Sequence, residues 1–168
     1  MASTHRNSKS GDLNAVCSGA VAGLVATAPM TAVMVAIHRQ LPTPQRQRRL
    51  PPEQITVSLA EKVAVDDSVS RAGEKLLTGV SHFGYGGVCG AAYGLYAERA
   101  KSNPLIAGPA FGLAVWAASY LGWLPALKIR RSATDEHAGI NTMMIAAHLV
   151  WGASTAIVYQ ALKERRSE

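Results

Sequence analysis

Charged residues divide the chain into four long apolar segments and the polar stretches between them. No Asp, Glu, Lys or Arg occurs within residues 13–37, 76–97, 102–127 or 137–162. A helix of a soluble protein needs a polar face, which would interrupt such segments every turn or two. Each segment reaches the roughly 20 residues that cross a bilayer. The pattern predicts an all-α polytopic membrane protein with four transmembrane helices, at about residues 13–37, 76–97, 104–127 and 139–162.

The polar stretches set the limits of this membrane domain. We expect one transmembrane domain over residues 13–162, after a disordered polar N-terminus (1–12) and before a polar tail (163–168). The mean hydropathy of +0.08 is that of a soluble protein, and an Ala- and Gly-rich soluble bundle is the alternative. The clustering of the charges outside the four segments favours the membrane protein.

The first connection, residues 38–75, divides into two parts. Residues 38–50 are basic and contain two prolines, so an extended chain is predicted there. The second part opens with Pro51 and Pro52, which suit the first turn of a helix. Ile55, Leu59, Ala60 and Val63 then recur at helical spacing, while the charged residues Glu53, Glu61 and Lys62 point elsewhere. We predict a short amphipathic helix that lies on the membrane surface or caps the bundle.

The second and fourth segments resemble each other at an offset of 66 residues. At this offset, residues 82–99 align with residues 148–165, and the aligned pairs are His82/His148, Tyr85/Trp151, Gly86/Gly152, Tyr93/Tyr159 and Glu98/Glu164. This similarity predicts that the four helices form two helix-hairpin repeats. Chance similarity between two Ala- and Gly-rich helices is the alternative.

Small residues recur at a spacing of four in all four segments, as glycines in the first three and as Gly152 with Ala156 in the fourth. In membrane helices, small residues at this spacing let two backbones approach closely. The predicted packing positions are Gly19, Gly23, Gly86, Gly90, Gly94, Gly108, Gly112 and Gly152.

Two histidines occur inside apolar segments. If the second and fourth helices run in the same direction, His82 and His148 lie at the same depth in the membrane. We predict that they share an intramembrane pocket with polar and aromatic side chains at that depth. The candidate pocket residues are His82, His148, Thr31, Met34, Tyr120, Trp123, Tyr85 and Trp151. The pocket is either a ligand or proton site or a set of structural hydrogen bonds between helices.

The sequence contains few residues or motifs that indicate a metal site, a cofactor site or catalysis. No further carboxylate or Cys ligand accompanies the two histidines, so no metal site and no cofactor are predicted. Phosphate-binding, zinc-protease and serine-hydrolase motifs are absent, and no catalytic residue is predicted. The net charge of +6 comes from basic residues that flank apolar helices. This arrangement favours contact with membrane lipids and argues against nucleic acid as a partner.

Four segments carry a resemblance to a known family: GLVATAPMTAVM, LPPEQIT, HFGYGGVCGAAYGLY and MMIAAHLVWGAS. Together they resemble the YagU-like family of uncharacterised bacterial inner-membrane proteins, over most of residues 15–160. The resemblance implies a small multi-pass protein of the bacterial cytoplasmic membrane with an unassigned biochemical role. It implies no catalytic residues.

Two functional expectations follow from these patterns. The first is a non-enzymatic membrane protein with a structural role, which self-associates as a homo-oligomer. The alternative is a small transporter or channel-like subunit with a ligand or proton site at the level of His82 and His148. A membrane enzyme or haem protein is the third class, and the identity of any small-molecule ligand stays unknown.

Overall fold

The computed structural model describes residues 2–62, 70–100 and 102–166, with only the backbone described for residues 2–10. Every regular element among these residues is a helix, as the charge pattern predicts. The long helices are α1 (Ala2–His38), α4 (Arg71–Arg99), α5 (Pro104–Ala117) and α7 (Ala138–Glu164). The shorter ones are α2 (Thr43–Arg46), α3 (Pro51–Lys62), the π-helical η1 (Ala118–Trp123), α6 (Leu124–Ala126) and the 3-10 turn η2 (Ala133–Asp135).

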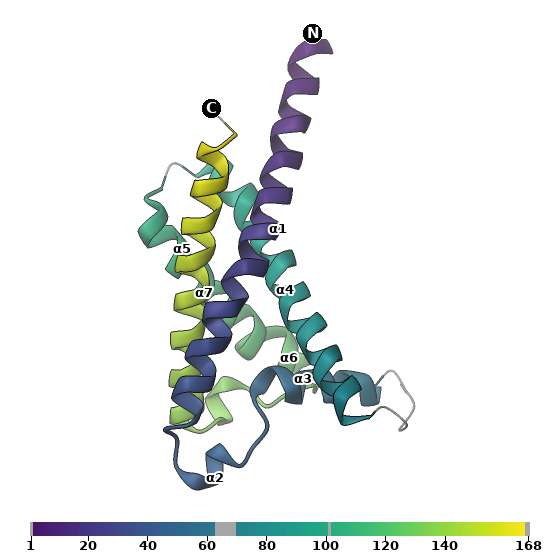
Figure 1. Cartoon of the computed structure of the whole chain (residues 1–168), viewed down its shortest axis with the longest axis vertical. Helices are drawn as coiled ribbons and strands as arrows, with labels where there is room; N and C mark the ends of the chain where they lie inside the picture. Colours follow the sequence, from purple (N-terminus) through teal and green to yellow (C-terminus); the bar gives the residue numbers. More distant parts are fainter. Residues whose placement is uncertain (1, 63–69, 101, 167–168) are drawn as a thin grey trace.

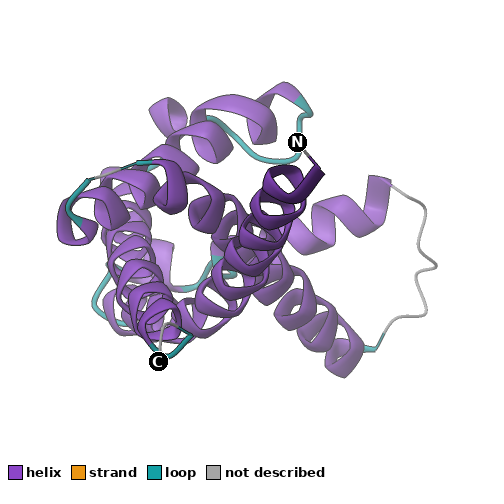
Figure 2. Ribbon diagram, turned by 90° about the horizontal axis from the view of Figure 1, so that it is seen from above, coloured by secondary structure: helices purple, strands orange, loops and turns teal. Residues whose placement is uncertain are grey.

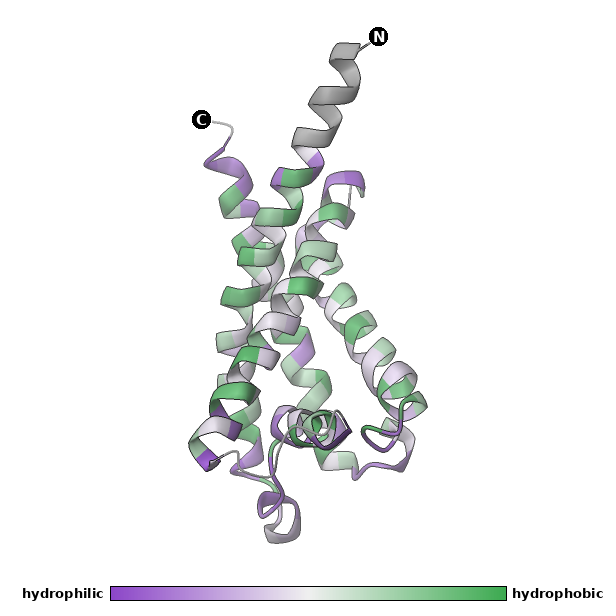
Figure 3. Ribbon diagram, turned by 90° about the vertical axis from the view of Figure 1, so that its right-hand side faces the viewer, coloured by the Kyte–Doolittle hydropathy of each residue, from purple (hydrophilic) through white to green (hydrophobic). Residues whose placement is uncertain are grey.

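Three helices are long and apolar enough to cross a membrane: Gly11–His38, Pro104–Ala126 and Ala138–Glu164. In Figure 3 their middle parts are largely hydrophobic, and polar residues gather at the ends of the bundle. The second predicted span, residues 76–97, lies within α4, which is not among the three. This segment carries no charge, but its glycines and tyrosines, together with Ser81 and His82, lower its hydropathy.

The long helices pack side by side in the order α4, α1, α7, α5. Figure 1 shows α1 and α5 running in one direction and α4 and α7 in the other, with both chain ends at the same end of the bundle. α4 packs along α1, but its first turns diverge from the rest of the bundle (Figure 2). α3 lies across this end and contacts α4 (Figure 1).

The eight glycines named above lie where two pairs of helices cross. At the crossing of α1 and α4, a methyl group on Gly90 would lie 2.7 Å from the Cα of Gly23. At the crossing of α5 and α7, a methyl group on Gly108 would lie 2.6 Å from the Cβ of Ala156. Because these distances are shorter than any ordinary carbon contact, the helices can approach this closely only without side chains there.

The ends of the chain and the first connection differ from the prediction. α1 begins at Ala2, so residues 2–12, predicted to be disordered, form its first turns, and α7 continues into the predicted polar tail as far as Glu164. Residues 1, 167 and 168 lie outside the described part. Residues 38–50 are not simply extended, because α2 forms a single turn there. Pro44 lies in the first turn, where its missing amide hydrogen needs no partner.

The third predicted helix is interrupted rather than continuous from 104 to 127. α5 ends at Ala117, and the π-helical η1 follows, with non-helical dihedral angles at Gly122 (φ −106°, ψ −105°). Pro125 has no amide hydrogen for the carbonyl of Leu121, and its ring crowds that carbonyl. Pro125 thus favours a break here, although α1 and α5 continue through Pro29 and Pro109, and the non-helical dihedral angles fall at Gly122. Asn103 caps the start of α5, where Pro104 takes the first position, as predicted.

Candidate functional site

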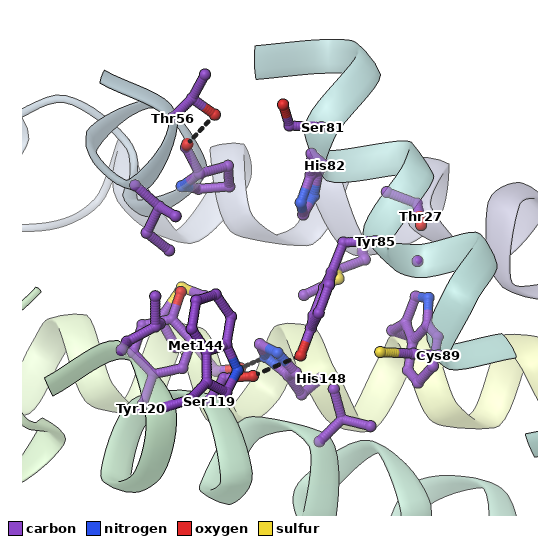
Figure 4. Close-up of a pocket in the computed structure, with 18 of the residues that line it drawn as sticks. Thr27, Thr56, Ser81, His82, Tyr85, Cys89, Ser119, Tyr120, Met144 and His148 are labelled. Atoms are coloured by element: carbon purple, nitrogen blue, oxygen red, sulfur yellow. Dashed lines mark hydrogen bonds between the residues drawn. The ribbon is translucent and has the colours of Figure 1, made fainter. Parts of the chain in front are cut away.

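A cavity of about 200 Å³ lies beneath α3, between the diverging start of α4, the π-helical η1 and α7 (Figure 4). α1 closes its inner side with Thr27 and Met30. Most of its lining is apolar, with several hydroxyl groups and two imidazoles. The lining residues are Thr27, Met30, Pro52, Ile55, Thr56, Leu59, Ser81, His82, Tyr85, Gly86, Cys89, Val115, Ser119, Tyr120, Trp123, Leu124, Met144, His148 and Trp151.

α4 contributes Ser81, His82, Tyr85 and Cys89, which follow one another at spacings of one, three and four residues. Residues three or four apart lie on one face of a helix, so these side chains face the cavity together. In Figure 4 the imidazole of His82 points into the space between α3 and α7. Its Nε2 atom is buried and has no hydrogen-bond partner among the described residues.

The π-helical segment brings several side chains to the opposite wall. The hydroxyl groups of Tyr85 and Ser119 are 2.9 Å apart and form a hydrogen bond that joins α4 to η1. The rings of Tyr85 and Trp123 are 6.1 Å apart, measured between centroids. Short π-helical segments commonly mark functional positions in helices. Here the segment places Ser119, Tyr120 and Trp123 around one cavity.

α7 supplies Met144, His148 and Trp151, again at helical spacing. The Nδ1 atom of His148 lies 2.8 Å from the carbonyl oxygen of Met144 and donates its proton to it. In a neutral ring with this tautomer, Nε2 is a hydrogen-bond acceptor. The ring of Tyr120 meets His148 edge to face at 5.9 Å. Trp151 donates from its indole nitrogen to the carbonyl of Gly23, at 3.2 Å.

α3 covers the cavity and is attached to the connection between α6 and α7. Arg130 donates a hydrogen bond to the side chain of Gln54 on α3. The same guanidinium group pairs with Glu136 at 2.6 Å, and both side chains are largely buried. Arg130 also lies 5.7 Å from the centre of the Tyr120 ring, behind the cavity wall. The amphipathic helix therefore caps the bundle, one of the two positions predicted for it.

None of the described residues that line the cavity is an Asp, Glu, Lys or Arg. The nearby charge on Arg130 is already paired with Glu136. Among the described residues no group of three or more His, Cys, Asp or Glu side chains could hold a metal ion. The arrangement is suited to hydrogen bonding with an uncharged molecule.

The structure brings together six of the eight residues predicted for the pocket: His82, His148, Tyr85, Tyr120, Trp123 and Trp151. Thr31 and Met34 do not line it. The hydroxyl group of Thr31 donates to the carbonyl of Thr27, and Met34 is buried in the core. Thr27 and Met30, one helical turn earlier, take their places. The register of α1 against α4 is fixed by the contact of Gly23 with Gly86, which depth counting from the segment ends cannot give.

Sequence reasoning assigned none of the lining residues of α3 to the pocket and left out several on the long helices. Thr56 and Ile55 come from the predicted amphipathic helix, whose apolar face gives the only sequence signal for them. Cys89 and Met144 lie three or four residues from predicted pocket residues on the same helix face. Extending the helical spacing from His82 and His148 would have found both.

A second, more polar cavity lies at the other end of the bundle, between the ends of α4 and α7. The Tyr159 hydroxyl donates to the Glu98 carboxylate at 2.7 Å, and Lys163 lies 3.0 Å from the same oxygen. The hydrogen bond from Tyr159, followed by the charge and hydrogen bond of Lys163, lowers the pKa of Glu98 below its usual 4.5. These contacts tie the end of α4 to α7.

The sequence of this chain matches a family model over most of its length. The model of the family described as "Protein of unknown function (DUF1440)" matches residues 29–157. The chain belongs to the DUF1440 family. No curated protein and no solved structure matches it.

The DUF1440 match includes every cavity-lining residue except Thr27. It includes α3 and η1, which form the cap and the π-helical wall of the cavity. Gly19 and Gly23, on the α1 side of the first helix crossing, precede it, and Tyr159 follows it. The description of DUF1440 assigns no activity, so the function must be argued from the cavity itself.

Proposed function

We propose that the chain is an integral membrane protein with four spans, in which residues 76–97 of α4 form the fourth. The support comes from the crossing of α1 and α4. Along this crossing Gly94 faces Ala15 and Gly86 faces Thr27, so this part of α4 lies beside an apolar span of α1. A bilayer that contains residues 15–27 of α1 must therefore also contain residues 86–94 of α4. These residues carry no charge to prevent this.

We further propose that the helices form two repeats, α1 with α4 and α5 with α7. Two observations support this layout: equivalent glycine contacts within the two hairpins, and one contact between matching residues. Gly86 faces Gly23 as Gly152 faces Gly108, and the rings of Tyr93 and Tyr159 meet each other 5.9 Å apart. Residues that match in a two-fold repeat touch each other only near its axis.

Hydrogen bonds between the two hairpins support the same layout. Trp151 on α7 bonds to Gly23 on α1, and its counterpart Tyr85 on α4 bonds to Ser119, just after α5. Each bond joins the second helix of one hairpin to the first helix, or its continuation, of the other.

The function that we propose is the binding of a small uncharged molecule in the cavity, without catalysis. One observation carries this proposal: the buried Nε2 atom of His82 faces a cavity and has no partner among the described residues. An unpaired imidazole nitrogen in an apolar setting costs free energy, which a bound molecule would recover. His82 differs in this from His38, whose Nε2 also has no described partner but does not line the cavity.

The remaining expectations stay predictions. We place the protein in the bacterial cytoplasmic membrane, among the YagU-like proteins, in contact with membrane lipids. Cross-linking in intact membranes would test the expected homo-oligomer. Fractionation of the cells would test the location, because an inner-membrane protein must separate from outer-membrane markers.

Filling the cavity tests the binding function. Cys89→Phe places a ring in the cavity, whereas Cys17→Phe alters the other cysteine, which is exposed on α1. We would measure thermal unfolding in phosphatidylcholine nanodiscs with neutral, anionic and cationic ten-carbon amphiphiles. At least one probe should raise the melting temperature of the wild type and of Cys17→Phe, but not of Cys89→Phe. The proposal fails if no probe does so, or if Cys89→Phe responds equally.

A further inference from the structure

We propose that the cavity takes the head group of a neutral lipid, a carbonyl or hydroxyl group that hydrogen-bonds to His82, and that the lipid chain leaves between α4 and η1. This inference rests on the proposed binding function and names its ligand class. Four features of the cavity carry it: its charge, its unpaired polar atom, its size and the side that faces the bilayer.

The lining selects against charged head groups. Because the described lining has no Asp, Glu, Lys or Arg, a carboxylate, phosphate or ammonium group would be buried there without a partner. An unpaired charge in an apolar setting is far more costly than an unpaired neutral group. Fatty acids, phospholipid head groups and lipid amines are therefore disfavoured against alcohols, esters and quinones.

Hydrogen bonding places the head group at His82. Tyr85 and Ser119 bond to each other, and the Thr56 hydroxyl donates to the carbonyl of Pro52. The Nδ1 atom of His148 is used by Met144. Among the buried side-chain nitrogen and oxygen atoms of the described lining residues, only Nε2 of His82 has no partner, and a neutral imidazole nitrogen can donate to a carbonyl or accept from a hydroxyl group.

The size of the cavity implies that the ligand extends beyond it. A volume of about 200 Å³ is smaller than the roughly 300–1,000 Å³ of pockets that enclose a drug-sized ligand. It can hold a head group but not a lipid with its chain. Aromatic faces from Tyr85, Tyr120, Trp123 and Trp151 surround this volume and favour a flat head group.

The exit lies where α4 meets the π-helical segment. Tyr85 bridges the two helices by its bond to Ser119 while 40% of its surface remains exposed. Two residues from Tyr85 on α4 and two residues from Ser119 on η1, Phe83 and Leu121 are 36% and 47% exposed. In a membrane these exposed side chains contact acyl chains, so a lipid chain that passes Tyr85 continues into an apolar environment.

Native mass spectrometry of protein released from phosphatidylcholine nanodiscs tests the inference by counting bound probes. The probes are decylubiquinone for a carbonyl head, 1-decanol for a hydroxyl head, decanoate for an anion and decyltrimethylammonium for a cation. One neutral probe should bind per chain, at least tenfold more tightly than either ion. Whether decylubiquinone or 1-decanol binds more tightly then identifies the head group.

Substitutions of histidine separate this inference from the general binding function. His82→Phe keeps a ring but removes the nitrogens, and should weaken neutral binding about three- to tenfold. His82→Gln restores a hydrogen-bonding side chain and should recover part of the affinity. His38→Ala is the control, because His38 also has a buried Nε2 without a described partner but does not line the cavity.

Two results would overturn the inference while leaving the binding function intact. One is binding of either ion as tight as that of the neutral probes. The other is neutral binding that Cys89→Phe removes but His82→Phe leaves unchanged. If none of the four probes binds to the wild type or to Cys89→Phe, the binding function is contradicted as well. Circular dichroism of each variant confirms that it is folded before binding is compared.

Discussion

Individual glycines determine how closely the helices of this protein approach each other. On α4, a methyl group at Gly90 would lie 2.7 Å from the Cα of Gly23 and 2.8 Å from its amide nitrogen. Gly84, on the same helix, has no neighbouring atom within 4 Å of the corresponding point. Gly90 therefore leaves no room for a side chain, whereas Gly84 on the same helix does.

Gly90→Ala should destabilise the bundle, because the added methyl group meets backbone atoms that cannot move aside without separating the helices. We expect a loss of about 1–3 kcal/mol in the free energy of unfolding. Gly84→Ala, the control, should be neutral or more stable by up to about 1 kcal/mol, since alanine favours the helix. Thermal unfolding in detergent measures both. Equal effects of the two substitutions would show that α1 and α4 do not cross at these glycines.

Glu98 makes the protein sensitive to acid. Its pKa is lowered in the folded state by the hydrogen bond from Tyr159 and by Lys163. A carboxylate whose pKa is lowered by folding stabilises the folded state fully at a pH above its pKa in the unfolded chain, near 4.5. This stabilisation is lost as the pH falls through the pKa of the folded state. The melting temperature should therefore decrease as the pH is lowered below about 4.5.

Glu98→Gln should reduce this fall, because glutamine does not ionise. The effect is small, since the Glu98 side chain is one-third exposed and solvent weakens its interactions. Glu164→Gln, at the matching position of the repeat, is the control. Melting curves between pH 3 and pH 6 measure the difference, and parallel curves for wild type and Glu98→Gln would contradict the role of Glu98.

At the level of single residues, six of the eight side chains chosen from helical spacing and charge line one cavity. His82 and His148 stand out because a titratable side chain inside an apolar segment is unusual. Thr31 and Met34 were wrong for the pocket by one turn, because the register between antiparallel helices depends on which glycines meet. No spacing within one helix contains that information.

Among the elements, α3 and η1 give the cavity its shape, and each depends on one or two residues. The start of α3 at Pro51 and its amphipathic pattern could be predicted from sequence. The interruption of the third long helix could not, because Pro125 and Gly122 near a helix end predict only a stop. In the structure the chain continues through a π-helical turn, which places Ser119 opposite Tyr85.

Gln54→Ala should loosen α3, since it removes the hydrogen bond that the Gln54 side chain accepts from Arg130 and the one that it donates to the carbonyl of Arg49. A bond to a charged group contributes about 1.5–3 kcal/mol, so amide hydrogens in residues 51–62 should exchange about tenfold faster or more. Gln40→Ala removes only a weak exposed bond at 3.4 Å and serves as the control. Unchanged exchange in α3 would show that its apolar contacts alone hold the cap in place.

For the whole molecule, the number of spans decides where the chain ends lie. Figure 1 shows both ends at the same end of the bundle. Four spans place them on the same side of a membrane, whereas three would place them on opposite sides. Sequence predicted the helices themselves, but the packing of α1 between α4 and α7 depends on contacts between segments far apart in the chain.

Reporter fusions at the two ends should therefore give the same response. A fluorescent protein that folds only in the cytoplasm and a phosphatase active only outside it would be fused to each end in turn. The same response at both ends supports four spans. Opposite responses would contradict the proposal that α4 crosses the membrane. Carbonate washing of the membranes is the control, since an integral protein must stay in the pellet.

The attachment of α3 through Arg130 imposes an order on how the protein is made. α3 leaves the ribosome before the third long helix, and Arg130 is synthesised only after that helix is complete. Until then α3 contacts only the part of the chain made before it and α4, through its packing on α4 and the ion pair of Arg49, just before α3, with Glu74. The cavity wall formed by α7 does not yet exist at that stage. A chain that ends before residue 130 therefore lacks both the hydrogen bond from Arg130 to Gln54 and the side chains of Met144, His148 and Trp151 that line the cavity.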